Sequence, residues 1–139
     1  MTKLSLRIID NHVDEDAEKR VIQNFLPDII EISSNPIRAG IIYALAKTPA
    51  TGHSMKVEDM AFRLGKYHRI VLHHLERLEK WELVEVKRTK AYGRKTKRSV
   101  WGLNLKYPNW IFEVYHSVKS GFSDRELETL CNTNRSMRD

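Results

Sequence analysis

The sequence predicts a mostly helical α+β protein with one small antiparallel β-hairpin. Apolar residues recur at intervals of three and four along most of the chain, which is the period of an amphipathic helix. Between residues 83 and 105 the pattern changes, and two runs rich in Val, Thr and Trp flank a turn that contains Gly93. The expected order of elements is three helices, a hairpin and further helices.

The first part of the chain is expected to hold two helices. Residues 14–32 form the first, because apolar residues share one face and acidic residues at its start suit the positive end of a helix dipole. Pro27 kinks or splits this helix, since proline lacks a backbone donor. Asn35 then caps a new helix with Pro36 in its first turn, and this helix ends near Pro49.

Two short helices follow with the arrangement of a helix-turn-helix. Residues 51–54 are expected to form a loop, and residues 57–64 then carry apolar side chains at i, i+3, i+4 and i+7. Gly65 opens a tight break, after which residues 67–81 form a third helix with its own apolar face. Two short helices joined by a few residues that include glycine are typical of a helix-turn-helix.

The hairpin follows directly. Residues 83–90 and 98–105 are expected to be its strands, and residues 91–97 its loop, where Gly93 is available for a positive φ angle.

The C-terminal part is expected to be helical again. An apolar stripe runs from Tyr107 to Val118, and Ser123 with Glu126 forms a capping box that opens a last short helix. The expected organisation has three segments: an N-terminal helical segment (1–34), a winged helix-turn-helix core (35–106), and C-terminal helices with a tail (107–139).

The charge of the chain is unevenly distributed. The net charge is +6 over 139 residues. Residues 1–31 hold four basic and seven acidic side chains, a net charge of −3, so the remaining residues hold 20 basic and 11 acidic ones, a net charge of +9. A basic body of this kind favours a polyanionic partner.

Several classes of protein are disfavoured. No apolar run is long enough to span a membrane, and the N-terminus has no secretory signal pattern. Cys131 is the single cysteine, which excludes a disulfide or a thiolate zinc site within one chain and favours a reducing cytoplasm. The six histidines have no metal-ligand spacing, and no nucleophile elbow or phosphate loop is present. We therefore expect no enzyme activity, no metal and no cofactor.

The hairpin carries the strongest local signal. No acidic residue lies between Lys87 and Arg98, and cations clustered on one hairpin repel each other unless phosphates lie nearby. Arg94, beside Gly93, is placed to reach a minor groove. A solvated charged hairpin is the alternative. The candidate phosphate contacts are Lys87, Arg88, Lys90, Arg94, Lys95, Lys97 and Arg98.

The third helix of the core supplies the candidate base contacts. A helix in the major groove presents its N-terminal and outward residues to base edges. Arg69 is suited to guanine, and Leu72 either meets a thymine methyl group or extends the apolar core face. The candidate residues are Tyr67, His68, Arg69, Leu72 and His73.

Residues 71–84 resemble the recognition helix and first wing strand of ArsR-like winged-helix regulators. The matching positions are Val71, His74, Leu75, Leu78, Leu83 and Val84, and Asn35, Pro36, Arg38, Ile41 and Leu45 resemble the first core helix of that family. The resemblance covers residues 35–105. Leu72 stands where the family usually has serine, Tyr67 replaces a small capping residue, and the cysteines of the family's metal sensors are absent from this region.

The resemblance implies a homodimer, because the outer helices of ArsR-like regulators form the dimer interface. The residues implied here are Val21, Ile22, Phe25, Leu26, Ile29, Trp110, Ile111, Val114, Tyr115 and Val118. Packing of the same stripes within one monomer is the alternative.

The sequence as a whole favours a dimeric winged-helix transcriptional regulator that binds double-stranded DNA. A protein–protein adaptor of the transcription machinery is the alternative, and a redox-responsive regulator that senses through Cys131 is a third. The operator, the regulated genes and any effector ligand are left open.

Overall fold

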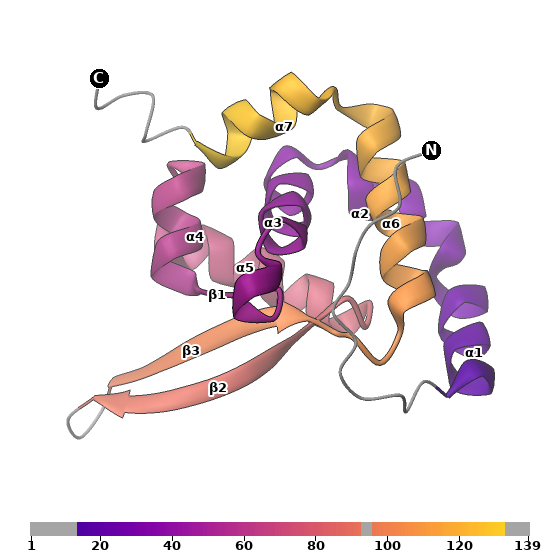
Figure 1. The fold of residues 1–139 in the computed structure, drawn as a ribbon, viewed down its shortest axis with the longest axis horizontal. Coiled ribbons are helices and arrows are strands. Elements are labelled where there is room, and N and C mark those ends of the chain that lie inside the picture. Colours follow the sequence, from indigo (N-terminus) through magenta and orange to yellow (C-terminus); the bar gives the residue numbers. More distant parts are fainter. Residues whose placement is uncertain (1–13, 93–95, 133–139) are drawn as a thin grey trace.

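The computed structural model describes residues 14–92 and 96–132, and for residues 88–92 and 96–99 it describes the backbone alone (Figure 1). The described elements are, in order, α1 (Glu15–Phe25), η1 (Leu26–Asp28), α2 (Ile29–Ser34), α3 (Pro36–Ala46), η2 (Pro49–Thr51), β1 (Ser54–Lys56), α4 (Val57–Leu64), α5 (His68–Lys80), β2 (Val84–Tyr92), β3 (Thr96–Leu103), α6 (Pro108–Gly121) and α7 (Asp124–Cys131).

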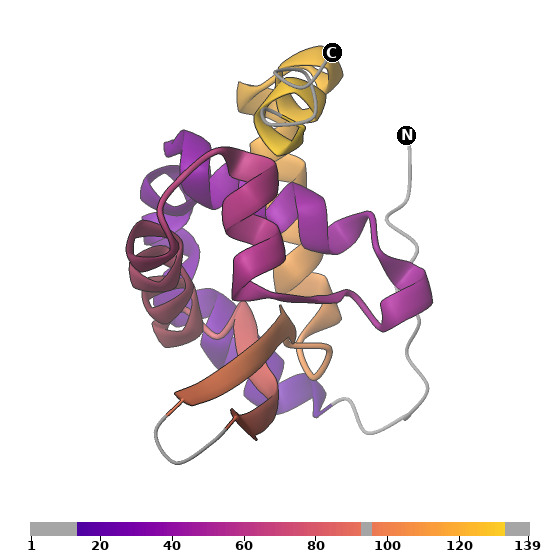
Figure 2. The same ribbon diagram turned by 90° about the vertical axis from the view of Figure 1, so that its left-hand side faces the viewer.

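The fold is a winged helix: α3, α4 and α5 are followed by a hairpin, and the described strands form a small antiparallel sheet of order β1-β3-β2. This confirms the expected fold class. In both ribbon views the hairpin projects away from the helices, and α7 lies at the opposite end of the molecule (Figures 1 and 2).

The sheet differs from the expectation in two ways. Ser54 was expected to end a loop and residues 55–56 were assigned to no element, yet Ser54 pairs with Gly102 and Lys56 with Val100. A three-residue strand shows no period of its own, and its partner lies far along the chain. The hairpin strands also lie nearer to the turn than the expected 83–90 and 98–105, since β2 reaches Tyr92 and β3 runs from Thr96 to Leu103.

The helix boundaries follow local capping chemistry. The Asn35 Oδ1 accepts hydrogen bonds from the backbone nitrogens of Ile37 and Arg38, at 2.9 and 3.1 Å. Pro27 lies in η1, which splits the first predicted helix into α1 and α2. The capping box of Ser123 and Glu126 opens α7. These three predictions are confirmed.

One continuous apolar core includes residues from all three predicted segments. The N-terminus of α6 is fixed to α1 by Glu18, which is only 3% exposed. Its carboxylate accepts hydrogen bonds from the backbone nitrogens of Asn109 (2.8 Å) and Trp110 (3.3 Å) and from Asn109 Nδ2 (2.8 Å). A carboxylate at this position satisfies the free N–H groups of the helix end and suits its dipole.

The residues implied for a dimer interface divide into two groups. Four of them on α6 are at most 1% exposed in the single chain: Trp110, Ile111, Val114 and Val118. These four belong to the core of the monomer and have no surface to offer a second copy, so the monomer-packing alternative describes them. Leu26 is 43% exposed, and the others are partly buried against the core: Val21, Ile22, Phe25, Ile29 and Tyr115.

Candidate nucleic-acid interface

Helix α5 presents a free leading end. Gly65 adopts a left-handed conformation (φ 62°) that ends α4, and the chain then enters α5 through Tyr67. Tyr67 is 82% exposed, and His68 and Arg69 are also exposed. The opposite face is fully buried and holds Val71, Leu75 and Leu78. The helix therefore offers its first turn to a partner while its other face packs into the core.

The apolar residue of this exposed turn is Ile70, which is 38% exposed and was not among the expected contacts. Leu72 is half-buried and packs against the core, so the structure supports the core alternative for Leu72. Tyr67, His68, Arg69 and Ile70 together line a shallow hollow of about 510 Å³. His73 is exposed one turn further along.

All seven expected phosphate contacts belong to the hairpin segment. Arg94 and Lys95 lie outside the described residues, and the side chains of four others are not described: Arg88, Lys90, Lys97 and Arg98. Lys87 is half-buried, and its Nζ donates to Glu85 Oε1 at 2.9 Å. This internal partner, two residues before the cationic run, makes Lys87 less available to a phosphate than the sequence suggested.

A buried arginine fixes α5 against α2 and α3. Arg38 is 8% exposed, and its guanidinium donates to the carbonyl oxygens of Glu31 (2.6 Å) and Ile32 (3.3 Å) near the C-terminus of α2. Its Nη1 lies 3.3 Å from His74 Nδ1, and its guanidinium lies 5.5 Å from the centre of the Trp81 ring. A cation at a helix C-terminus and over an aromatic face is favourable. Arg38 thus fixes the position of α5 relative to α2.

His74 is a structural residue in this arrangement. Arginine can only donate hydrogen bonds, so Nδ1 of His74 must accept and the imidazole is neutral. Burial and the nearby Arg38 lower the pKa of His74. Its role as a packed residue was expected; the role of Arg38 was not.

We expect the free energy of unfolding to decrease as the pH falls from about 7.5 to about 5.5, and part of this dependence to disappear in His74→Gln. Because the folded state lowers the pKa of His74, the unfolded chain binds a proton near its ordinary pKa of about 6.5 that the folded chain does not bind. Urea denaturation at each pH measures this. His68→Gln, at an exposed position in the first turn of α5, is the control, and an unchanged pH dependence in His74→Gln would contradict the assignment.

Within residues 14–92 and 96–132, no three His, Cys, Asp or Glu side chains gather as a metal site would require. In the same part of the chain, no helix is long and apolar enough to cross a membrane.

Comparisons with known proteins assign no family to this chain. No family model matches the chain. A search of curated proteins also gives no significant match. Among solved structures, the chain is similar to the crystal structure of NadR in complex with 4-hydroxyphenylacetate, at 17% sequence identity and a TM-score of 0.46, over 99% of this chain and 92% of that one. The resemblance to ArsR-like regulators therefore remains a prediction.

Proposed function

We propose that this protein is a transcriptional regulator that binds double-stranded DNA through its winged helix. The observation that carries the proposal is the pairing of an exposed first turn of α5 with a projecting hairpin that is rich in cations. Helix α5 enters the major groove with Tyr67, His68, Arg69 and Ile70 toward the bases. The hairpin lies along the phosphates and orients the protein without reading sequence.

The strand register of the hairpin supports a phosphate partner. Lys90 stands directly opposite Arg98. Like charges at opposite positions destabilise an antiparallel pair, so two cations here weaken the hairpin on its own. A polyanion that lies along the hairpin removes this cost and releases its own counterions.

The proposed regulator acts as a homodimer. Leu26 and Ile30 lie next to the partly buried apolar face of α1 and α2 and are 43% and 68% exposed. Exposed apolar side chains of this size are the natural contacts for a second copy. Two-fold symmetry would place two α5 helices on half-sites about one duplex turn apart. The molar mass of the wild-type protein by light scattering tests this part of the proposal.

The test of DNA binding is a titration of labelled duplex with the wild-type protein, followed by fluorescence anisotropy over a series of salt concentrations. We expect binding that weakens linearly in log affinity against log salt, followed by a preferred sequence from a selection on random duplexes. No binding at low salt would contradict the proposal. The adaptor function would then be favoured, because Tyr67 and Ile70 also offer an apolar surface to a protein partner.

Arg69→Ala is expected to relax the sequence preference. If Arg69 donates two hydrogen bonds to one guanine, its loss should cost about 1–3 kcal/mol on the preferred duplex and much less on a random one. Anisotropy on both duplexes measures the difference. Equal losses on the two would show that Arg69 contacts phosphate and not a base.

Ile70→Ala is expected to remove sensitivity to thymine methyl groups. An apolar side chain in the groove contacts the methyl group of thymine, and burial of one methyl group contributes about 0.8 kcal/mol, or roughly fourfold in affinity. Replacing thymine by deoxyuridine in the selected site should therefore weaken binding of the wild type and leave the variant unaffected. Leu72→Ala is the control, and the same uracil effect in the wild type and Ile70→Ala would exclude this contact.

A further inference from the structure

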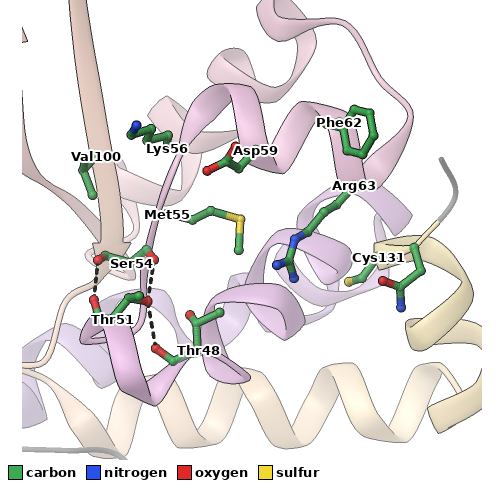
Figure 3. A pocket seen from close by; sticks show the side chains of 11 residues that line it. Thr48, Thr51, Ser54, Met55, Lys56, Asp59, Phe62, Arg63, Val100 and Cys131 are labelled. Carbon is green, nitrogen blue, oxygen red and sulfur yellow. Dashed lines mark hydrogen bonds between the residues drawn. The ribbon is translucent and has the colours of Figure 1, made fainter. Parts of the chain in front are cut away.

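A pocket of about 550 Å³ lies beside α4, and none of its lining residues belongs to α5 (Figure 3). It is lined by residues of η2, β1, α4 and β3 together with the end of α7. Its volume is in the range of small-molecule sites, which are mostly apolar with a few convergent polar groups.

Arg63 supplies the convergent charge. Figure 3 shows its guanidinium directed into the pocket, toward Met55 and Cys131. Among the side chains that the structure describes, no hydrogen bond or ion pair involves Arg63. Asp59, one turn earlier on α4, lies on the Lys56 side of the pocket. A half-buried guanidinium without an anion is costly and favours a ligand that brings one.

The thiol beside Arg63 does not supply that anion. Cys131 is 4% exposed, and its Sγ lies 3.2 Å from the Gly40 carbonyl oxygen, to which it donates. Burial, with a further contribution from Glu128, raises the pKa of Cys131 to about 11. The thiol is therefore neutral at physiological pH and offers Arg63 no negative charge.

The hydroxyl groups of the pocket are committed to the backbone. Thr48 Oγ1 donates to the Leu45 carbonyl oxygen at 2.9 Å, and Ser54 Oγ donates to that of Thr51 at 2.6 Å. These hydroxyls offer only lone pairs to a ligand, and lone pairs repel an anion. Arg63 is thus the donor at the inner end, while Met55 gives an apolar surface beside it.

We propose that this pocket binds a small organic monocarboxylate, with the carboxylate on Arg63 and an apolar body over Met55. A single guanidinium matches a single carboxylate in a bidentate pair. Lys56 and Asp59 carry opposite charges on the same lining, so the three charged side chains have a net charge of +1, which disfavours ligands of higher negative charge such as phosphate esters. This binding site does not depend on the proposed DNA-binding function.

The test is a titration of the full chain with hexanoate, without DNA, followed by ¹H–¹⁵N chemical shifts. Hexanoate should bind saturably and shift the amides of α4 and the end of α7. Pentanol and pentylammonium have the same five-carbon alkyl chain as hexanoate without the negative charge, and, like hexanol and hexylammonium, they should bind at least about tenfold more weakly.

Two variants locate the carboxylate. Arg63→Gln should weaken hexanoate binding by about tenfold or more, and Arg20→Gln on the exposed face of α1 should leave it unchanged. Asp59→Asn, at an exposed position, should tighten binding by roughly threefold because it removes a repulsive charge. If Arg63→Gln does not fold, the hexanoate affinity of Asp59→Asn tests the proposal. Absence of saturation up to about 50 mM hexanoate would overturn the proposal. The proposal would also be overturned if hexylammonium bound as tightly as hexanoate, or if Arg63→Gln and Asp59→Asn both bound hexanoate with the wild-type affinity.

Discussion

Trp110→Ala is expected to lower the free energy of unfolding by about 3–5 kcal/mol. The Trp110 side chain is 0% exposed, and its Nε1 donates to the Trp81 carbonyl oxygen at 2.7 Å. Its ring stacks on Phe25 with 6.4 Å between the ring centroids. Truncation leaves a large cavity between α1 and α6 and an unsatisfied carbonyl oxygen. Since small domains are stable by about 5–15 kcal/mol, the variant should be close to unfolding.

Urea denaturation of the wild type, Trp110→Ala and Trp110→Phe measures this effect. The phenylalanine variant keeps much of the ring volume and loses the hydrogen bond, so it should lie between the other two. Glu113→Ala, on the exposed face of the same helix, is the control and should change stability by no more than about 0.5 kcal/mol. A Trp110→Ala protein as stable as the wild type but monomeric would return Trp110 to the dimer interface.

The sequence predicted that the helix face with Trp110 is buried, but not which surface buries it. The stripe from Tyr107 to Val118 identified a buried helix face, because a period depends only on residues that are neighbours on the same helix. The same stripe could not distinguish burial inside one chain from burial against a second copy. The deciding partner is Glu18, which lies 91 residues before Asn109 and binds the start of α6. Nothing in the local pattern marks that carboxylate as buried.

Features that depend only on residues close together in the sequence were predicted, whereas β1, which depends on a distant partner, was not. The Asn35 cap, the split at Pro27 and the capping box at Ser123 are local, and all three were predictable. β1 exists because β3 pairs with it, and no local signal within three residues indicates such pairing.

In the candidate site, the helical period placed α5 correctly but left Leu72 ambiguous. Leu72 is adjacent to the buried Val71 and packs at the edge of the core face, whereas Ile70, on the other side of Val71, is exposed. The position of Arg38 behind α5 depends on carbonyl groups of α2, and backbone carbonyls leave no trace in a residue pattern.

Replacing four hairpin cations by glutamine is expected to reduce affinity for any duplex by about 10²–10³ near 0.1 M salt. The variant is Arg94→Gln, Lys95→Gln, Lys97→Gln and Arg98→Gln. Each phosphate contact releases close to one counterion, so the slope of log affinity against log salt should decrease by about one for each residue that contacts a phosphate. Anisotropy titrations on the preferred and a random duplex, at four or more salt concentrations, give both quantities.

The control must remove the same charge elsewhere, because a change in net charge alone alters long-range attraction to DNA. Two lysines and two arginines outside the hairpin are exposed and serve this purpose: Lys19, Arg20, Lys80 and Arg125. Their replacement by glutamine matches the hairpin variant in number, type and charge. If the hairpin lies on the phosphates, only the hairpin variant loses the salt slope, and it does so equally on both duplexes. Equal losses in the two variants would show that the hairpin acts through net charge, and an unchanged slope in the hairpin variant would place DNA elsewhere on the molecule.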